Sequence, residues 1–292
     1  MDRIETELSN NYLVTEEIGS GSFGEVYLAE HVDGGFVAIK VEDKRKAHRI
    51  REEYKIYRYL TKNNFTIGIP KVHEFLQSTD FNIMVMQLLG PNLEELFNTY
   101  NKKFQLGTIF LLAIQILSLL ENLHRLKFIH RDIKPSNFLI SRNSNVEQVY
   151  IMDFGLAKKY INHGKHINFR DGLSLIGTVR YASNNIHMGF EPSRRDDLES
   201  LGYMLIYFLK GELPWQGIKK KFGENYMEKV GEIKMCTPLN KLCKGLPDCF
   251  LKYMIYCRKL KFTQDPDYDY LKSLFTESVK KMSIIPTYEW RE

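Results

Sequence analysis

Asp132, Asn137 and Asp153 are side chains whose types and spacing could transfer a phosphoryl group to a hydroxyl group. Asp132, in the run His-Arg-Asp-Ile-Lys-Pro-Ser-Asn, could take up the proton of the attacking hydroxyl. Asn137 and Asp153 offer hard oxygen ligands, which Mg²⁺ prefers when it bridges phosphates. Lys134 could neutralise the charge that builds up on the transferred phosphoryl oxygens. These four residues predict a site for metal-assisted phosphoryl transfer.

A glycine-rich run at residues 19–24 lies upstream and has the spacing G-x-G-x-x-G. This spacing alone is weak support, because dinucleotide-binding folds use it too. Here the pattern predicts two further strands after the run and no helix, which favours a β-hairpin lid whose amides approach nucleotide phosphates. Glycine is needed because a Cβ would hold the backbone away from the phosphates. A purely structural glycine turn is the less favoured alternative.

Lys40 ends the run Val-Ala-Ile-Lys and is predicted to contact the α- and β-phosphates. A carboxylate on the following helix should hold this lysine, because an unpaired buried ammonium is costly. Glu52 and Glu53 are both candidates. A solvated lysine at a strand end is the alternative, and Ala38 and Ile39 argue against it because they suit the wall of a pocket.

The elements that must position these residues are strands in the first third of the chain and helices beyond residue 90. Asp33-Gly34 predicts a hairpin turn in which both residues take positive φ. Asn92, with Glu95 three residues later, predicts a helix N-cap. Asp197 could be an N-cap, a support that accepts hydrogen bonds from the catalytic-loop backbone, or both, because an aspartate at a helix start can do both. The predicted strands span residues 12–18, 25–31, 36–41, 72–76 and 82–88, and the predicted helices span residues 47–60, 93–100, 107–126, 196–210, 247–259 and 267–281.

The composition fits a soluble enzyme, because 292 residues with 43% hydrophobic and 26% charged side chains can bury a sizeable core. A net charge of +5 is too mild for nucleic-acid binding and suits ATP and acidic or phosphorylated polypeptides. Four irregularly spaced cysteines favour free thiols in a reducing compartment over a zinc site. The charged N-terminus is unlike a signal peptide. The apolar residues 109–120 predict a core helix and are too few to span a membrane, so we expect the protein in the cytoplasm, the nucleus or both. We also expect a monomer.

Beyond these motifs, residues 12–274 resemble the casein kinase 1 family of serine/threonine protein kinases. Most protein kinases have Ala-Pro-Glu after the activation segment, whereas this family has Ser-Ile-Asn and this chain has Ser183-Asn184-Asn185. The resemblance implies an α+β, bilobal protein kinase fold at residues 12–282, with a small β-rich N-lobe at 1–88, a hinge at 87–91 and a larger helical C-lobe at 91–292. The stretches that carry it are residues 84–91, 130–139, 153–160, 177–183, 193–202, 213–217 and 266–268.

The resemblance also implies transfer of the γ-phosphate of ATP, with Mg²⁺, to Ser or Thr hydroxyls. Asp132 and Lys134 would be catalytic, and Lys134 separates serine/threonine kinases from most tyrosine kinases. Alignment with the family favours Glu53 over Glu52 as the partner of Lys40. Asn137 and Asp153 would bind Mg²⁺, while the backbone of Gln87 and Leu89 would bind adenine, with Met86 as gatekeeper. The full nucleotide-binding set is Ile18, Gly19, Ser20, Gly21, Ser22, Phe23, Gly24, Glu25, Val26, Ala38, Lys40, Met86, Gln87, Leu89, Asn92, Glu95, Leu139 and Met152.

The family favours serines downstream of a phosphorylated or acidic residue, which it binds at a basic site near the activation segment. Arg180 matches one member of that site, but Leu173 and Tyr226 replace the two lysines that usually complete it. Lysines at residues 219–221 could compensate, although an exposed charge run is the preferred interpretation. We therefore expect only a modest gain from a phosphorylated, or primed, substrate.

The resemblance implies an activation segment that is ordered without phosphorylation, although Ser174 and Thr178 could be modified. Two other classes of protein share the fold. One is a pseudokinase that acts as a scaffold, which the intact Lys40, Asp132, Asn137 and Asp153 argue against. The other is a small-molecule kinase, which the family-like residues 193–202 argue against.

Overall fold

The computed structural model describes residues 8, 11–21, 24–45, 49–143, 147–219 and 225–291. The chain forms two compact units. The first contains Met1–Pro91 and Leu139–Gly155, and the second contains Asn92–Phe138 and Leu156–Glu292. Residues 139–155 therefore belong to the first unit, whereas the predicted C-lobe at residues 91–292 includes them.

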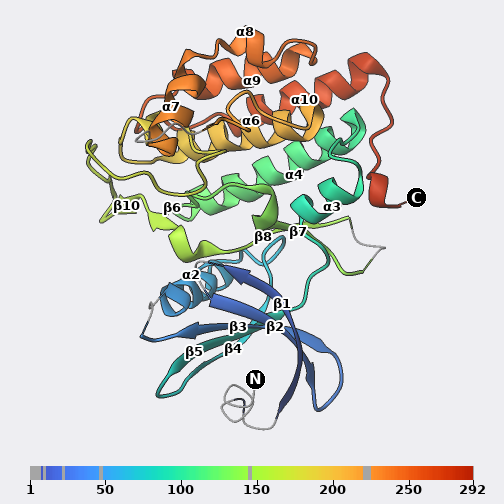
Figure 1. Ribbon diagram of the computed structural model, residues 1–292, viewed down its shortest axis with the longest axis vertical. Helices are drawn as coiled ribbons and strands as arrows, with labels where there is room; N and C mark the ends of the chain where they lie inside the picture. Colours follow the sequence, from blue (N-terminus) through green and yellow to red (C-terminus); the bar gives the residue numbers. More distant parts are fainter. Residues whose placement is uncertain are drawn as a thin grey trace. The chain divides into compact units, whose positions relative to one another are not determined.

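The first unit is built on a five-stranded antiparallel sheet with the order β1-β2-β3-β5-β4 (Figure 1). Helix α2 (Arg49–Lys62) packs against β3, β4 and β5. Every residue of β3 except its two ends is buried, and Val37, Ile39 and Val41 belong to the apolar core of this unit. The predicted start of α2 at residue 47 lies outside the described residues. The strands are β1 (Tyr12–Gly21), β2 (Gly24–His31), β3 (Phe36–Asp43), β4 (Val72–Gln77) and β5 (Phe81–Gln87).

The hairpin between β2 and β3 differs from the prediction. Positive φ occurs at Gly34 (91°) and Gly35 (94°), so the prediction is right for Gly34 and wrong for Asp33. The Gly34 N–H donates to His31 O at 2.8 Å, and the His31 N–H donates to Gly35 O at 2.9 Å. Because two glycines are available, the strained conformations fall on the residues without a Cβ.

The second unit is helical (Figure 1). Helix α4 (Leu106–Arg125) packs against α6 (Arg194–Lys210) and α10 (Tyr268–Met282), and α6 packs against α9 (Asp248–Lys259). Within the described ranges, α4 alone is long and apolar enough to cross a membrane. Its apolar side chains are buried against neighbouring helices, as expected for a core helix.

The predicted helices are present with ends shifted by one or two residues, including α3 (Leu93–Thr99). Three helices were not predicted: α5 (Asn184–His187), α7 (Tyr226–Cys236) and α8 (Leu239–Leu242). The shorter elements include η1 (Pro135–Asn137), η2 (Phe154–Leu156) and η3 (Glu289–Arg291). Short ladders pair β6 (Phe128–Ile129) with β9 (Lys158–Lys159), β7 (Phe138–Ile140) with β8 (Val149–Ile151), and β10 (Ile161–Asn162) with β11 (Lys165–His166).

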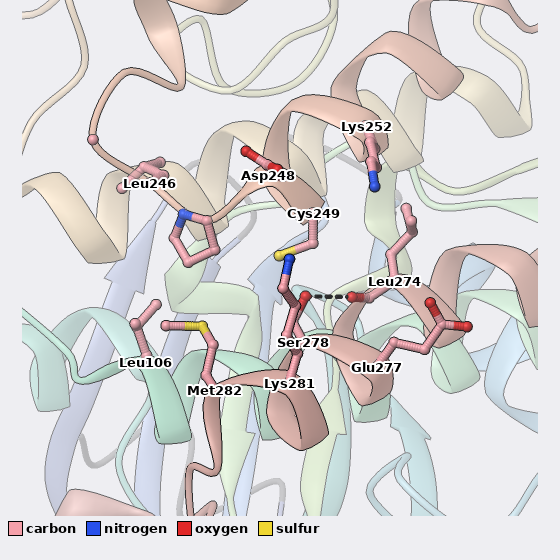
Figure 2. Close-up of a pocket in the computed structure, with 12 residues that line it drawn as sticks. Leu106, Leu246, Asp248, Cys249, Lys252, Leu274, Glu277, Ser278, Lys281 and Met282 are labelled. Carbon is pink, nitrogen blue, oxygen red and sulfur yellow. Dashed lines mark hydrogen bonds between the residues drawn. The ribbon is translucent and has the colours of Figure 1, made fainter.

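A pocket of about 530 Å³ opens in the second unit beside α4, α9 and α10. Figure 2 shows apolar side chains, including Leu106 and Met282, together with charged ones such as Lys252 and Glu277. Its Cys249 is a free thiol whose pKa is raised by burial. None of the predicted site residues lines this pocket.

Candidate active site

The catalytic loop of the second unit holds Asp132 in one orientation. Asp132 is buried, and one carboxylate oxygen, Oδ2, lies 2.8 Å from Lys134 Nζ. Its other oxygen, Oδ1, accepts a hydrogen bond from Thr178 Oγ1 at 2.7 Å. The side-chain amide of Asn137 donates to the backbone oxygen of Asp132 at 2.8 Å. The three loop residues expected to do chemistry therefore contact one another, and Thr178 joins them from the activation segment.

Asp197 supports this loop from helix α6. Its carboxylate accepts the backbone N–H groups of His130 at 2.7 Å and Arg131 at 2.8 Å, and it lies 2.8 Å from His124 Nε2. These bonds fix a turn in which Arg131 takes a φ of 68°, which is uncommon for a residue with a side chain. The supporting role predicted for Asp197 is thus confirmed. The N-cap alternative is wrong, because α6 is capped at Ser193.

The end of the activation segment packs closely against the loop that contains Arg131 and Asp132. Gly177 has a φ of 82°, and a Cβ at this position would lie 2.4 Å from Arg131 O. The next residue, Thr178, bonds Asp132. From the sequence, Thr178 is predicted only to be a residue that could be phosphorylated. Its hydroxyl has a different use here, because it orients the carboxylate.

Lys40 is held in the first unit by two carboxylates. Its Nζ lies 2.7 Å from Glu53 Oε2 and 3.1 Å from Asp153 Oδ1. Of the two candidate partners, Glu53 is buried, whereas Glu52 is exposed and pairs with Lys55. Burial alone lowers the pKa of the Lys40 ammonium, but the charges of Glu53 and Asp153 outweigh it and raise that pKa above its ordinary value. Lys40 is therefore a fixed positive charge.

The backbone at Asp153 is held by the aromatic residue that follows it. Asp153 has a φ of 63°, and Phe154 is buried with its ring 4.9 Å from that of Tyr57 in an edge-to-face contact. Tyr57 lies one helical turn after Glu53 on α2. Helix α2 thus positions both carboxylates that contact Lys40, one directly and one through Phe154.

The residues expected to surround adenine belong to the first unit. In the sheet, Ala38 lies opposite Met86, and Val26 lies opposite Lys40. The Gly90 N–H donates to Ile140 O at 3.0 Å, which holds β7, the strand of Leu139, beside the expected hinge. Ile18 is partly exposed, Leu89 is buried, and Ser22 and Phe23 lie outside the described residues.

Two details of this region bear on the predicted contacts. The side chain of Gln87 accepts the Lys71 N–H at 3.2 Å, so it points toward the residue that precedes β4. Gly24 has a φ of 121°, and a Cβ there would lie 2.1 Å from Val41 O. The glycine at residue 24 is therefore required by the neighbouring strand, which is a different reason from the predicted approach of phosphates.

Asn92 and Glu95 form the capping box that their spacing predicts. Asn92 Oδ1 accepts the N–H groups of Glu94 at 2.9 Å and Glu95 at 3.0 Å, and Glu95 Oε2 accepts the Asn92 N–H at 3.1 Å. The predicted N-cap is confirmed. A contact of either side chain with the nucleotide stays a prediction.

Arg180 lies in an aromatic and acidic setting within the second unit. Its guanidinium is 5.8 Å from the Tyr181 ring centre and 5.3 Å from that of Tyr207, and it lies 3.9 Å from Glu94 Oε1. Of the predicted lysine run, only Lys219 belongs to the described residues, and it is exposed. The described part of the chain thus surrounds the Arg180 guanidinium with one carboxylate and two tyrosines.

A family model described as the protein kinase domain matches residues 12–261, which is most of the chain. The chain belongs to the protein kinase family. This membership makes it a phosphotransferase that uses ATP and, as is typical of the family, a divalent metal. The predicted α+β fold, with a β-rich unit and a larger helical unit, is confirmed.

Proposed function

We propose that this kinase is a serine/threonine protein kinase of the casein kinase 1 type that acts on acidic or phosphorylated protein substrates. The observation that carries the proposal is the 2.8 Å contact between Asp132 Oδ2 and Lys134 Nζ. A carboxylate in this position can accept the proton of a Ser or Thr hydroxyl. The ammonium beside it can offset charge on the transferred phosphoryl group. The paired Lys40 and Glu53 favour an active enzyme over a pseudokinase scaffold.

The residues proposed to bind Mg²⁺ suit a hard cation. The side-chain N–H of Asn137 donates to Asp132 O, and its amide oxygen is the atom that would bind the metal. Asp153 contacts Lys40 through Oδ1, and a carboxylate can bind more than one cation. Bound Mg²⁺ would neutralise phosphate charge and orient ATP. Asn137 belongs to the second unit and Asp153 to the first.

The surroundings of Arg180 support a weak preference for primed substrates. Glu94 would compete with a substrate phosphate for the guanidinium, although a partly exposed ion pair of this kind contributes only about 0–1 kcal/mol. A phosphate is best bound by several cationic donors. Leu173 and Tyr226 supply none. We propose that the enzyme acts as a monomer in the cytoplasm or nucleus, on proteins and not on nucleic acid.

A peptide series is expected to show phosphorylation of serine and threonine but not of tyrosine. With serine as acceptor, phosphoserine three residues upstream should raise kcat/KM by less than about tenfold over alanine, because Arg180 acts without lysine partners. Aspartate should give a smaller gain than phosphoserine, because it carries less charge. The measurement is steady-state kinetics on matched peptides at fixed ATP.

Arg180→Ala is the informative variant for this series. The phosphoserine gain should nearly disappear, while kcat/KM for the alanine peptide changes little. A gain of about a hundredfold or more that Arg180→Ala abolishes would show a complete anion site and refute weak priming. Phosphorylation of tyrosine alone would refute the serine/threonine assignment.

We infer that the activation segment is ordered without phosphorylation, because a carboxylate already pairs with its basic residues. The buried Glu191 contacts Lys158 Nζ at 2.5 Å and Arg170 Nη2 at 2.6 Å. The catalytic-loop arginine, Arg131, donates Nε to Leu156 O at 2.6 Å. Burial raises the pKa of Glu191, but the hydrogen bonds and charges of Lys158 and Arg170 outweigh it, so this pKa lies below its ordinary value. Glu191 thus supplies the negative charge that a phosphate supplies in phosphorylation-switched kinases.

Phosphatase treatment is expected to leave activity unchanged, whereas Glu191→Gln should lower kcat/KM about tenfold by freeing the segment. Because its folded-state pKa is lowered, Glu191 contributes stability that is present above the ordinary glutamate pKa of about 4.3 and is lost as pH falls through the lowered value. The Tm values of wild type and Glu191→Gln should therefore converge in acid.

Glu212→Gln, at an exposed position, is the matched control and should behave as wild type. Loss of most activity after phosphatase treatment would contradict the inference. So would a Glu191→Gln protein with full activity and an unchanged Tm at neutral pH.

A further inference from the structure

A completely buried lysine on helix α7 contacts the segment that carries Arg180. Lys234 is 0% exposed, and its Nζ donates to three backbone oxygens: Ala182 O at 2.6 Å, Val179 O at 3.0 Å and Arg180 O at 3.3 Å. Among the described residues, the hydrogen-bond partners of its ammonium are these carbonyl oxygens and His187 Nε2, and none is a carboxylate. A buried ammonium with such partners is costly compared with an apolar side chain. This free-energy cost of burial indicates that the lysine serves to hold these carbonyl groups in position.

The rest of the surroundings of Lys234 also come from the second unit. The ring centres of Trp215 and Tyr203 lie 4.9 Å and 5.1 Å from Nζ, which favours a cation. The charged or titratable groups that face it are Glu199 on α6, Arg258 on α9 and His187 on α5, whose Nε2 lies 3.1 Å away.

These surroundings set the protonation of the pair formed by Lys234 and His187. Burial lowers the pKa of Lys234 to about 7, with Glu199 opposing this effect and Arg258 adding to it. Burial and the neighbouring Lys234 lower the pKa of His187 to about 4. His187 is therefore neutral at physiological pH, and Lys234 titrates there.

Two further features hold the same backbone. Trp215 Nε1 donates to Arg180 O at 2.8 Å, so two donors converge on one carbonyl. One helical turn before Lys234, Gly231 lets α7 approach His187, because a Cβ there would lie 2.8 Å from His187 Nδ1. The segment held in this way directly follows Thr178, which bonds Asp132.

We propose that Lys234 is a substrate-positioning residue, whose ammonium holds the backbone of residues 179–182 in the conformation in which Arg180 and its neighbours receive the polypeptide substrate. The proposal rests on the proposed function, because it presupposes a polypeptide bound beside Arg180. Lys234 bonds this backbone directly, and it influences the position of Thr178 only through this backbone. Its loss should therefore affect the polypeptide and not ATP.

Lys234→Met removes the three donors while it keeps the length of the side chain. The KM for a serine peptide is expected to rise about tenfold, whereas kcat and the KM for ATP stay within about twofold. Lys241→Met, at an exposed position on α8, is the control and should match wild type. A purely structural role would instead change both KM values together with Tm.

Trp215→Phe provides a second, milder variant should Lys234→Met fail to fold. It removes one donor to Arg180 O and keeps an aromatic ring over Lys234. The peptide KM should rise about threefold with an unchanged KM for ATP. A peptide KM that stays at the wild-type value in Trp215→Phe and in any folded Lys234→Met protein would overturn the proposal.

A readout without catalysis uses Trp215, one of two tryptophans in the chain. In a Trp290→Phe protein, the Trp215 emission should titrate near pH 7, and the peptide KM of wild type should rise over the same range as the ammonium loses an N–H donor. Both changes should be absent with Lys234→Arg, which stays charged. Should wild type phosphorylate no peptide, the proposed function fails. The Trp215 emission then decides alone whether Lys234 holds the segment, and an emission that Lys234→Met leaves unchanged at every pH overturns the proposal.

Discussion

Asp132→Asn is expected to lower kcat about 1,000-fold while the KM for ATP stays within about twofold. Asparagine keeps the shape of the side chain but cannot accept the proton of a hydroxyl. The ion pair with Lys134 at 2.8 Å also loses its negative partner. The loop itself should persist, because Asn137 bonds the backbone oxygen of residue 132 and Asp197 bonds the N–H groups before it.

Transfer of labelled phosphate from ATP to casein measures this effect. Asp171→Asn is the matched control, because Asp171 is an exposed aspartate of the activation segment, and this variant should retain wild-type activity. A Tm close to that of wild type would separate lost chemistry from lost folding. Equal incorporation by Asp132→Asn and wild type would refute the catalytic assignment.

The clustering of the residues proposed to be catalytic was predictable because their signal is local. Asp132, Lys134 and Asn137 lie within one short motif, and the structure brings their side chains together. The choice between Glu52 and Glu53 also had a local signal that the prediction did not use. Glu53 falls on the buried face of α2, at helical spacing from Ile50 and Tyr57. Helical periodicity alone would have selected Glu53.

The contacts that hold the site in place were not predictable, because they join residues that are far apart in the chain. Thr178 meets Asp132 across 46 residues, Glu191 meets Lys158 across 33, and Lys234 meets Ala182 across 52. Nothing in the local pattern identifies such partners. A buried lysine in particular has the same sequence signal as an exposed one, because burial is decided by the packing around it.

The secondary structure divides in the same way. Long periodic segments such as α4 were placed to within a residue at each end, because many positions share the pattern. Helices α5 and α8 have four residues each, which is too few for a periodic signal. The two-residue strands β6 and β9 beside the catalytic loop likewise exist only through their pairing.

Gly177→Ala is expected to lower kcat about 100-fold, because a displacement of about 1 Å at a catalytic group has an effect of that size. The new Cβ would lie 2.4 Å from Arg131 O, a distance that requires the backbone of the catalytic loop or of the activation segment to move. Either movement separates Thr178 from Asp132, whose 2.7 Å hydrogen bond orients the carboxylate. The KM for ATP should change little, because the alanine methyl group meets the catalytic loop and not Lys40.

Gly172→Ala is the matched control for backbone strain. Gly172 also has a positive φ, 66°, but a Cβ there would meet nothing within 4 Å. Both substitutions carry the left-handed penalty of about 1–2 kcal/mol, so a lower Tm is expected for both. Only Gly177→Ala adds the clash with Arg131 O, and only it should lose kcat, while Gly172→Ala stays within about threefold of wild type. Equal kcat values for the two variants would show that backbone strain, and not the contact with Arg131 O, lowers kcat. The activation segment would then not align Asp132 through Gly177 and Thr178.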